Sequence, residues 1–293
     1  MSHHHVNQLI HVMWSTLDQK YLIPKSINDE LHAYVSAVIK SKKGRVLLTG
    51  GANDHIHLLI VLSAEISLSH LLSHVKAHSS KWIKSRGSID PEFSWQKGYL
   101  GFSTQESRMD SVCSYIRDDE KRHQFKKETY TDELRAILEH QNIKYDKNFF
   151  PQNSFTKILV HAVWSTHNRT PCLGRLVRDN LYKQIKNTVL GFRGTVHEIG
   201  GIEDHVHLLM EIPRDLSLSD AMREIKTTST HWLKHNDGSK YRNFEWQTGF
   251  GGFTVSLSHL ETVKNYIQKQ DEHHRRFSFK EEWEKFLLNK GIE

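Results

Sequence analysis

Residues 50–59 read Gly-Gly-Ala-Asn-Asp-His-Ile-His-Leu-Leu, and the pattern returns at residues 200–209 as Gly-Gly-Ile-Glu-Asp-His-Val-His-Leu-Leu. At the same spacing, residues 11–16 (HVMWST) lie over residues 161–166 (HAVWST). Solenoid repeats have units of about 20–50 residues, whereas this period has the size of a domain. The 293-residue chain is therefore a tandem duplication, with one copy at residues 1–150 and the other at residues 151–293.

The charge balance is basic and evenly divided between the copies. The chain has 40 Lys and Arg against 34 Asp and Glu, a net charge of +6 and a pI near 9.1. This balance favours a polyanionic partner. The 22 histidines are a more unusual feature of the composition.

The cysteines and the apolar runs indicate a cellular compartment, and the two cysteines fit a reducing one. Cys113 and Cys172 fall at non-equivalent places in the two copies, so they predict neither a disulfide framework nor a zinc site. No apolar run approaches the length of a membrane span, and no charged-then-apolar leader precedes the first copy. We expect a soluble, cytoplasmic protein.

Apolar periodicity predicts the element order β-α-β-β-α-β-α in each copy. In the first copy the expected elements are residues 8–15, 28–39, 45–49, 55–62, 68–84, 99–103 and 109–123. In the second they are residues 157–166, 176–190, 194–200, 204–212, 218–234, 250–256 and 260–274. Consecutive strands joined by tight turns pair antiparallel. The expected fold class is α+β: two tandem ferredoxin-like or RRM-like sandwiches, packed on each other as a pseudo-dimer.

Two histidines in the recurring motif are candidates for metal binding. Side chains alternate along a strand, so His55 and His57 share one face, as do His205 and His207. Two neighbouring imidazoles form a bidentate platform for a divalent cation. For one copy alone, two solvent-facing histidines would be the better interpretation, and the matched second pair shifts the balance toward metal.

The last expected helix of each copy carries a tyrosine. Tyr266 and Gln270 are four residues apart and so share one helical face, and the first copy has Tyr115 and Asp119 in these positions. Basic and histidine residues follow, including Arg275 and Arg276, which are candidate DNA contacts. A helical tyrosine usually packs in a core, but this surrounding suits a phenol that meets a phosphate.

Further candidates for DNA contact are Lys76 and Lys226 on matched helices, and Trp95 and Trp246. Each lysine could equally be solvated. The tryptophans could stack on bases or pack in a core, and the sequence does not favour either role.

Taken in order, the motifs resemble the HUH single-tyrosine transposases, which include insertion-sequence transposases and REP-associated tyrosine transposases. The resemblance rests on His-x-x-Trp-Ser-Thr, Asp-His-x-His-Leu-Leu, Ile-Lys-x-x-Ser at residues 225–229, Trp-Gln-x-Gly, and Tyr-Ile-x-x-Gln-x-x-His-His. It covers essentially the whole chain, once per copy.

The resemblance implies a metal-dependent endonuclease and strand transferase, with Mg²⁺ or Mn²⁺ as cofactor. Its substrate would be single-stranded DNA that contains a hairpin, in the bacterial or archaeal cytoplasm, near the nucleoid. The implied nucleophiles are Tyr266 and Tyr115. The implied metal ligands are His205, His207, Gln270, His55, His57 and, where the family has Gln, Asp119. This substitution makes the first copy less typical, so we expect the second site to be the more active.

Two other functions compete with this one. A domesticated hairpin-DNA-binding protein without cleavage activity would keep the fold, but it has no evident need for both tyrosines. A metal phosphodiesterase would explain the histidines and not the tyrosines. We expect the chain to be a monomer that acts as its own pseudo-dimer. The sequence leaves open whether each tyrosine serves its own copy or the other.

Overall fold

The computed structural model describes residues 5–86, 91–125, 129–145, 153–236, 238–275 and 281–282. The chain divides into two compact units. The first-copy unit is Leu9–Lys157, and the second-copy unit joins Met1–Gln8 to Ile158–Glu293. Among the helices in the described ranges, none has the length and apolar character needed to cross a bilayer.

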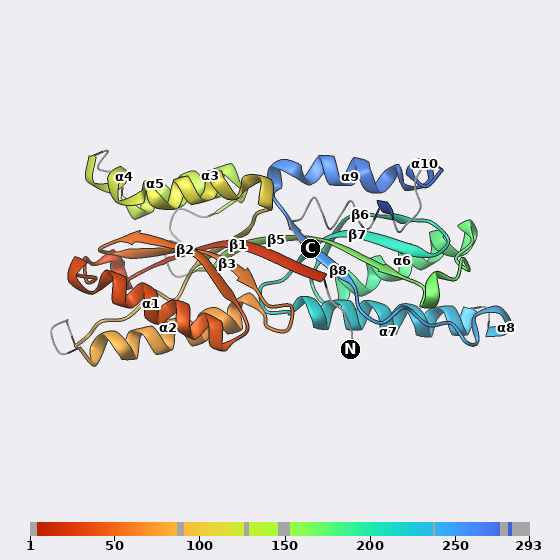
Figure 1. The fold of residues 1–293 in the computed structure, drawn as a ribbon, viewed down its shortest axis with the longest axis horizontal. Coiled ribbons are helices and arrows are strands. Elements are labelled where there is room, and N and C mark those ends of the chain that lie inside the picture. Colours follow the sequence, from red (N-terminus) through yellow and green to blue (C-terminus); the bar gives the residue numbers. More distant parts are fainter. Residues whose placement is uncertain are drawn as a thin grey trace. The chain divides into compact units, whose positions relative to one another are not determined.

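The first-copy unit places helices on both faces of a sheet (Figure 1). Its elements are β1 His5–Ser15, α1 Lys25–Ser41, β2 Arg45–Ala52, β3 His55–Leu62, α2 Leu68–Lys84, β4 Leu100–Ser103, α3 Glu106–Arg117, α4 Asp119–Phe125 and α5 Tyr130–His140. The strands lie in the order β2-β3-β1-β4, and both the β2–β3 and β1–β4 pairs are antiparallel. Residues 155–157 add a short parallel ladder on β4.

The second-copy unit repeats this plan. Its elements are β5 Phe155–Ser165, α6 Arg175–Gly191, β6 Thr195–Gly201, β7 His205–Ile212, α7 Leu218–Asn236, α8 Gly238–Tyr241, β8 Gly251–Val255, α9 Leu260–Gln268 and α10 Gln270–His273. The order β6-β7-β5-β8 is antiparallel throughout, and residues 5–7 of β1 lie parallel on β8. The predicted α+β class and its duplication are confirmed.

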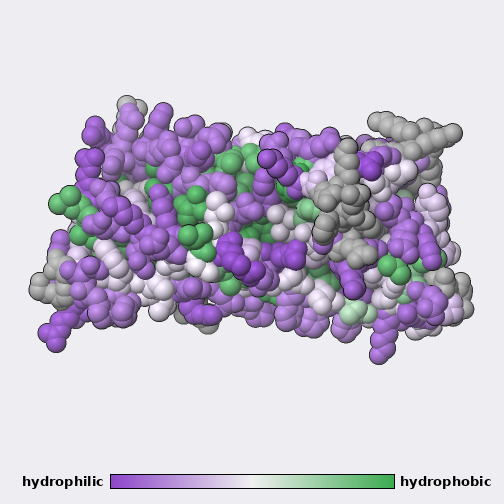
Figure 2. Space-filling view, turned by 180° about the vertical axis from the view of Figure 1, so that it is seen from behind, coloured by the Kyte–Doolittle hydropathy of each residue, from purple (hydrophilic) through white to green (hydrophobic). Residues whose placement is uncertain are grey.

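Regular burial explains why these segments become helices and strands. Helix α1 buries Ile27, Leu31, Val35 and Ile39, one residue per turn, and β3 is buried along nearly its whole length. The view in Figure 2 shows a surface dominated by hydrophilic side chains. On this face hydrophobic side chains are the minority.

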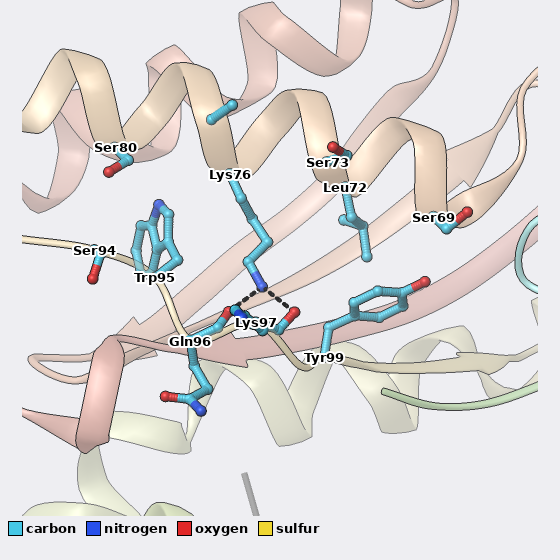
Figure 3. A pocket seen from close by; sticks show the side chains of 11 residues that line it. Ser69, Leu72, Ser73, Lys76, Ser80, Ser94, Trp95, Gln96, Lys97 and Tyr99 are labelled. Carbon is cyan, nitrogen blue, oxygen red and sulfur yellow. Dashed lines mark hydrogen bonds between the residues drawn. The ribbon is translucent and has the colours of Figure 1, made fainter. Parts of the chain in front are cut away.

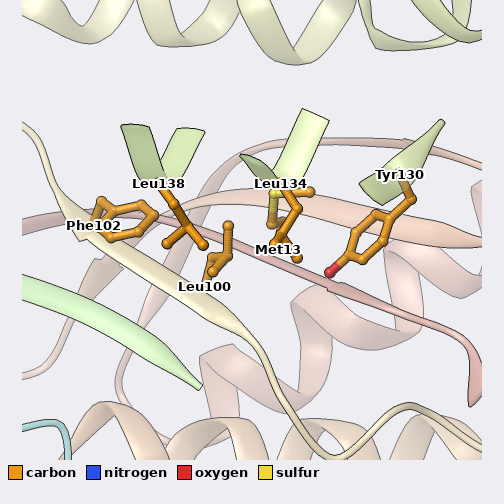
Figure 4. Close-up of a cluster of buried hydrophobic side chains, with 6 residues drawn as sticks. All are labelled: Met13, Leu100, Phe102, Tyr130, Leu134 and Leu138. Atoms are coloured by element: carbon orange, nitrogen blue, oxygen red, sulfur yellow. The ribbon is translucent and has the colours of Figure 1, made fainter. Parts of the chain in front are cut away.

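Helix α5 was not predicted from the sequence, and it carries a residue of the candidate site. Its apolar side chains pack on β1 and β4 in a cluster of Met13, Leu100, Phe102, Tyr130, Leu134 and Leu138 (Figure 4). Burying each leucine contributes about 1.5–3 kcal/mol. A capping box between Thr129 and Asp132 starts the helix.

The predicted helices at residues 109–123 and 260–274 are each broken in two, so the prediction of continuous helices is wrong. Asp118 has φ −87° and ψ 2°, and Lys269 has φ −94° and ψ 16°. These dihedrals interrupt the helix one residue before Asp119 and Gln270, both of which are buried. The break turns these two side chains toward the sheet, whereas a straight helix would have stacked them over the tyrosines.

Candidate metal centres

The Gly-Gly pair lets the tyrosine helix approach the sheet closely. A Cβ on Gly50 would lie 2.8 Å from the carbonyl oxygen of Ile116 in α3, and one on Gly200 would lie 2.6 Å from that of Ile267 in α9. The next glycine, Gly51 (φ 140°), adopts a backbone conformation that other residues rarely reach. The motif therefore places the helix directly above the histidine strand.

In the first copy, His55 and His57 lie on one face of β3 and are almost completely buried. The Nδ1 atom of His55 lies 2.7 Å from Asp54 Oδ1, and that of His57 lies 3.0 Å from His11 Nε2. These contacts at Nδ1 hold both rings with Nε2 directed at one point. Metal-binding histidines typically have such a hydrogen-bond partner on the ring nitrogen that does not bind the metal.

The second copy repeats these contacts. The Nδ1 atom of His205 lies 2.7 Å from Asp204 Oδ1, and that of His207 lies 2.9 Å from His161 Nε2. The histidine of the His-x-x-Trp-Ser-Thr motif thus orients the second ligand candidate in each copy.

Two carboxylates face the first pair of imidazoles. Asp119 Oδ2 lies 2.9 Å from His55 Nε2, and Glu133 Oε1 lies 3.4 Å from His57 Nε2. The ligand atoms of these four residues all lie within 4.8 Å of one another. We call His55, His57, Asp119 and Glu133 the first centre.

One carboxylate and one amide face the second pair. Glu282 Oε1 lies 3.6 Å from His207 Nε2, and Gln270 Oε1 lies 3.3 Å from His205 Nε2. The ligand atoms of His205, His207 and Glu282 lie within 4.8 Å of one another. We call these three residues, with Gln270, the second centre.

Both centres fit a divalent cation. The Nε2 atoms of His57 and His207 are buried and make no hydrogen bond, which is costly unless a ligand occupies the space before them. Imidazole nitrogen together with carboxylate and amide oxygen is a donor set that suits first-row divalent ions and Mg²⁺. The structure thus brings the ligand candidates from the sequence together and places Glu133 and Glu282 beside them.

Each candidate tyrosine lies beside the candidate metal centre of its own copy. The Tyr115 hydroxyl donates to Glu133 Oε1 at 2.5 Å, and the Tyr266 hydroxyl donates to Glu282 Oε1. The Tyr115 and His57 ring centroids are 6.0 Å apart, and those of Tyr266 and His207 are 5.7 Å apart. Of the two assemblies that the sequence left open, the structure has the one in which each tyrosine faces its own histidines.

Burial and the adjacent glutamate raise the pKa of both phenols above their usual value of 10.0. In this arrangement the phenols are protonated and hydrogen-bonded.

Glu133 and Glu282 were missed from the sequence. The repeat spacing changes to 149 in the tail, where residues 291–293 align with residues 142–144, and that spacing places Glu282 over Glu133. A Thr-x-x-Asp sequence at residues 129–132, typical of a helix start, precedes Glu133 and was available as a second signal. Following both signals would have revealed a matched pair of glutamates.

The predicted DNA contacts at the Trp-Gln-x-Gly loops have internal partners. Lys76 Nζ donates to the carbonyl oxygens of Gln96, Lys97 and Gly98, the latter two at 3.0 Å (Figure 3). Trp95 is 7% exposed, and its indole N–H donates to Ser79 Oγ at 2.9 Å. In this conformation both side chains tie the loop to α2.

The second copy makes the same loop contacts. Lys226 Nζ donates to the carbonyl oxygens of Gln247 and Gly249, at 2.6 and 2.9 Å, and Trp246 donates to Ser229 Oγ at 3.0 Å. The Ile-Lys-x-x-Ser motif thus holds the following loop in both copies. Of the remaining candidates, Arg275 is exposed and Arg276 lies outside the described residues.

Comparison with known proteins identifies the family. The family described as "Transposase IS200 like" (Y1_Tnp) matches residues 4–119 and 154–270, once in each copy. No curated protein matches the chain.

Among solved structures, a candidate transposase from Deinococcus radiodurans is 20% identical, with 44% of this chain and 98% of that one covered and a TM-score of 0.33. A REP-associated tyrosine transposase bound to a REP hairpin is 18% identical, with 40% and 68% covered and a TM-score of 0.33. The assignment rests on the family match, which spans most of both repeats. The chain belongs to the IS200-like transposase family and carries the family's domain twice.

Proposed function

We propose that the protein is a metal-dependent endonuclease and strand transferase for single-stranded DNA, with Tyr266 as principal nucleophile and Tyr115 as its counterpart. One observation carries the proposal: in both copies a tyrosine hydroxyl, a carboxylate and two imidazole nitrogens converge at one buried point. A core tyrosine does not need metal-binding side chains around its hydroxyl. A phosphodiesterase would have no use for the tyrosine.

The chain's own residues would bind and orient the reacting groups. His205, His207, Gln270 and Glu282 would hold the cation in the second copy, and His55, His57, Asp119 and Glu133 would hold it in the first. A bound divalent cation would polarise the scissile phosphate and offset the charge that develops in the transition state. We propose Mg²⁺ or Mn²⁺, because both accept this mixture of oxygen and imidazole ligands.

In the proposed reaction the Tyr266 oxygen forms a bond to phosphorus while the bond from phosphorus to the 3′ oxygen breaks. The phenol proton leaves toward Glu282 Oε1, which already accepts its hydrogen bond and then releases the proton to solvent. The departing oxygen takes one proton from solvent water to become a 3′-OH. The products are a 5′-phosphotyrosine and a free 3′-OH. The phosphoester energy is kept, so rejoining needs no ATP.

The DNA partner follows from the family. A transposase that acts through a tyrosine needs a strand whose phosphate can enter the site, and we propose single-stranded DNA beside a hairpin. Each centre is built from a single copy, and we propose that the protein is a monomer. Light scattering should then give a mass near 34.3 kDa.

The test is a denaturing gel. Hairpin-bearing single-stranded DNA, incubated with the protein and Mn²⁺, should give a covalent adduct that survives SDS. The adduct should not form when EDTA is present from the start. The double variant Tyr115→Phe, Tyr266→Phe is the control. Tight DNA binding without any adduct would instead identify a non-cutting hairpin-binding protein.

A further inference from the structure

Helix α2 carries a row of three histidines that the transposase chemistry does not use. His70, His74 and His78 are spaced by four residues and so lie along one side of the helix. His70 and His78 are exposed and His74 is half-buried. The row lies about 100° around the helix from the side of Ser69 and Ser73, which lines the pocket in Figure 3.

Two of these imidazoles lie close enough together to bind one metal ion. His70 Nε2 and His74 Nε2 are 2.9 Å apart and share a hydrogen bond, so a metal ion would replace the proton between them. Their rings lie nearly parallel, at 20°. Zinc–nitrogen bonds of about 2.0–2.1 Å, at ordinary angles between ligands, separate two imidazole nitrogens by about 2.9–3.4 Å. One metal ion can therefore join both nitrogens with little movement of either side chain.

The third histidine extends the row. The His74 and His78 rings are 6.1 Å apart and also nearly parallel, at 21°.

The row is specific to the first copy. The matched positions of α7 hold Asp220, Glu224 and Thr228.

We propose that His70 and His74 form a surface site for a transition-metal ion of the Zn²⁺, Ni²⁺ or Cu²⁺ class, with His78 available as a further ligand. A pair of histidines four apart on a helix is a known zinc-binding arrangement. The row has no carboxylate, in contrast to the buried centres, so it selects against Mg²⁺. This inference does not depend on the tyrosine chemistry.

The test follows the reactivity of individual histidines in the full chain. Diethylpyrocarbonate modifies neutral exposed imidazoles, and mass spectrometry locates the modified residues. With free Zn²⁺ at about ten times its dissociation constant, modification of His70 and His74 should slow about tenfold. Mg²⁺ should give no protection, and the exposed His140 on α5 should react equally in all conditions.

The variant His74→Ala separates shared binding from single-site binding. It should remove the Zn²⁺ protection of His70, while the matched His140→Ala leaves it intact. Equal reactivity of His70 with and without Zn²⁺ in the unaltered protein would overturn the proposal, and so would full protection of His70 in His74→Ala. A Mn²⁺-dependent DNA adduct that is the same for His74→Ala and the unaltered protein would show that the site is separate from the buried centres.

Discussion

The two centres have the same histidines and tyrosine but a different charge around them. The first centre faces its imidazoles with two carboxylates, Asp119 and Glu133, where the second has the amide of Gln270 and the carboxylate of Glu282. Two adjacent carboxylates require positive charge close by, because their mutual repulsion in a buried site is large. The first centre would therefore bind a cation more strongly if nothing else were present.

An arginine already supplies that charge. Arg122 donates to Asp119 Oδ1 at 2.7 Å and to Glu133 Oε1 at 2.8 Å, and its guanidinium lies 3.8 Å from the centre of the Tyr115 ring. At the matched position the second copy has His273, whose Nε2 is 3.8 Å from Glu282 Oε1. A permanent cation thus neutralises part of the carboxylate charge at the first centre, where the second copy has a histidine instead.

The histidines respond to the same difference. Burial lowers the pKa of His57, but Glu133 and Asp119 outweigh it and raise the value to about 9. Burial dominates at His207, where Glu282 only partly offsets it, and lowers the pKa to about 4. At neutral pH these shifts favour the neutral form of His207 and the protonated form of His57. The two copies therefore differ in the charge that a divalent ion would meet, and we expect the second centre to bind it more readily.

The largest expected effect separates the two tyrosines. Tyr266→Phe should lower formation of the DNA adduct by at least about 1000-fold, because it removes the oxygen that we propose as the nucleophile of the second centre. Tyr115→Phe should leave most of the adduct. Quantified denaturing gels measure both, and a larger loss for Tyr115→Phe would reverse the order of the two centres.

The second effect concerns metal affinity. Replacing both His205 and His207 with Ala should weaken Mn²⁺ binding at the second centre by about 100-fold or more, since two ligands are lost. The matched double variant at His55 and His57 should have a much smaller effect on total Mn²⁺ bound near pH 7. Electron paramagnetic resonance counts free Mn²⁺, and unchanged affinity in the first variant would remove these histidines from the site.

Exchanging Arg122 and His273 between the two centres should reverse part of the difference in their Mn²⁺ affinity. His273→Arg should weaken Mn²⁺ binding at the second centre by about tenfold, near 1.4 kcal/mol, because a fixed cation would then share Glu282. Arg122→His should strengthen binding at the first centre. Titrations of each variant, with the other centre's histidines replaced, would contradict this explanation if both exchanges left affinity unaltered.

The smallest effect is in the pH dependence. The ligand form of an imidazole is neutral, so a raised pKa weakens metal binding below it. At the first centre Mn²⁺ affinity should rise about threefold for each half unit of pH below about 9. At the second centre it should be nearly constant above about pH 6, as His207 is already neutral. Parallel slopes at the two centres would contradict the comparison.

Much of the fold could be predicted because its signals are local and duplicated. Strand alternation was enough to place His55 beside His57, and the matched copy made the pattern specific. The break before Gln270 could not be predicted, since Lys269 is an ordinary helix residue and the local sequence carries no signal for the change in its backbone conformation.

The candidate site was predicted in part for a similar reason. Its histidines and tyrosines lie in motifs, whereas Glu133 comes from a helix 14 residues beyond Asp119 and reaches the site only through long-range packing. Lys76 shows the opposite case: its motif suggested a phosphate contact, and the structure shows three backbone carbonyl partners. Partners of this kind depend on the tertiary fold and leave no spacing signal in the sequence.

We propose that Tyr266 is the residue that attacks DNA, at the second centre. Protein from a Mn²⁺ reaction with hairpin-bearing single-stranded DNA can be digested with nuclease and protease, and the nucleotide-linked peptide sequenced by mass spectrometry. The modification should lie on Tyr266, with little or none on Tyr115. A linkage confined to Tyr115, or to a residue outside both centres, would contradict the claim.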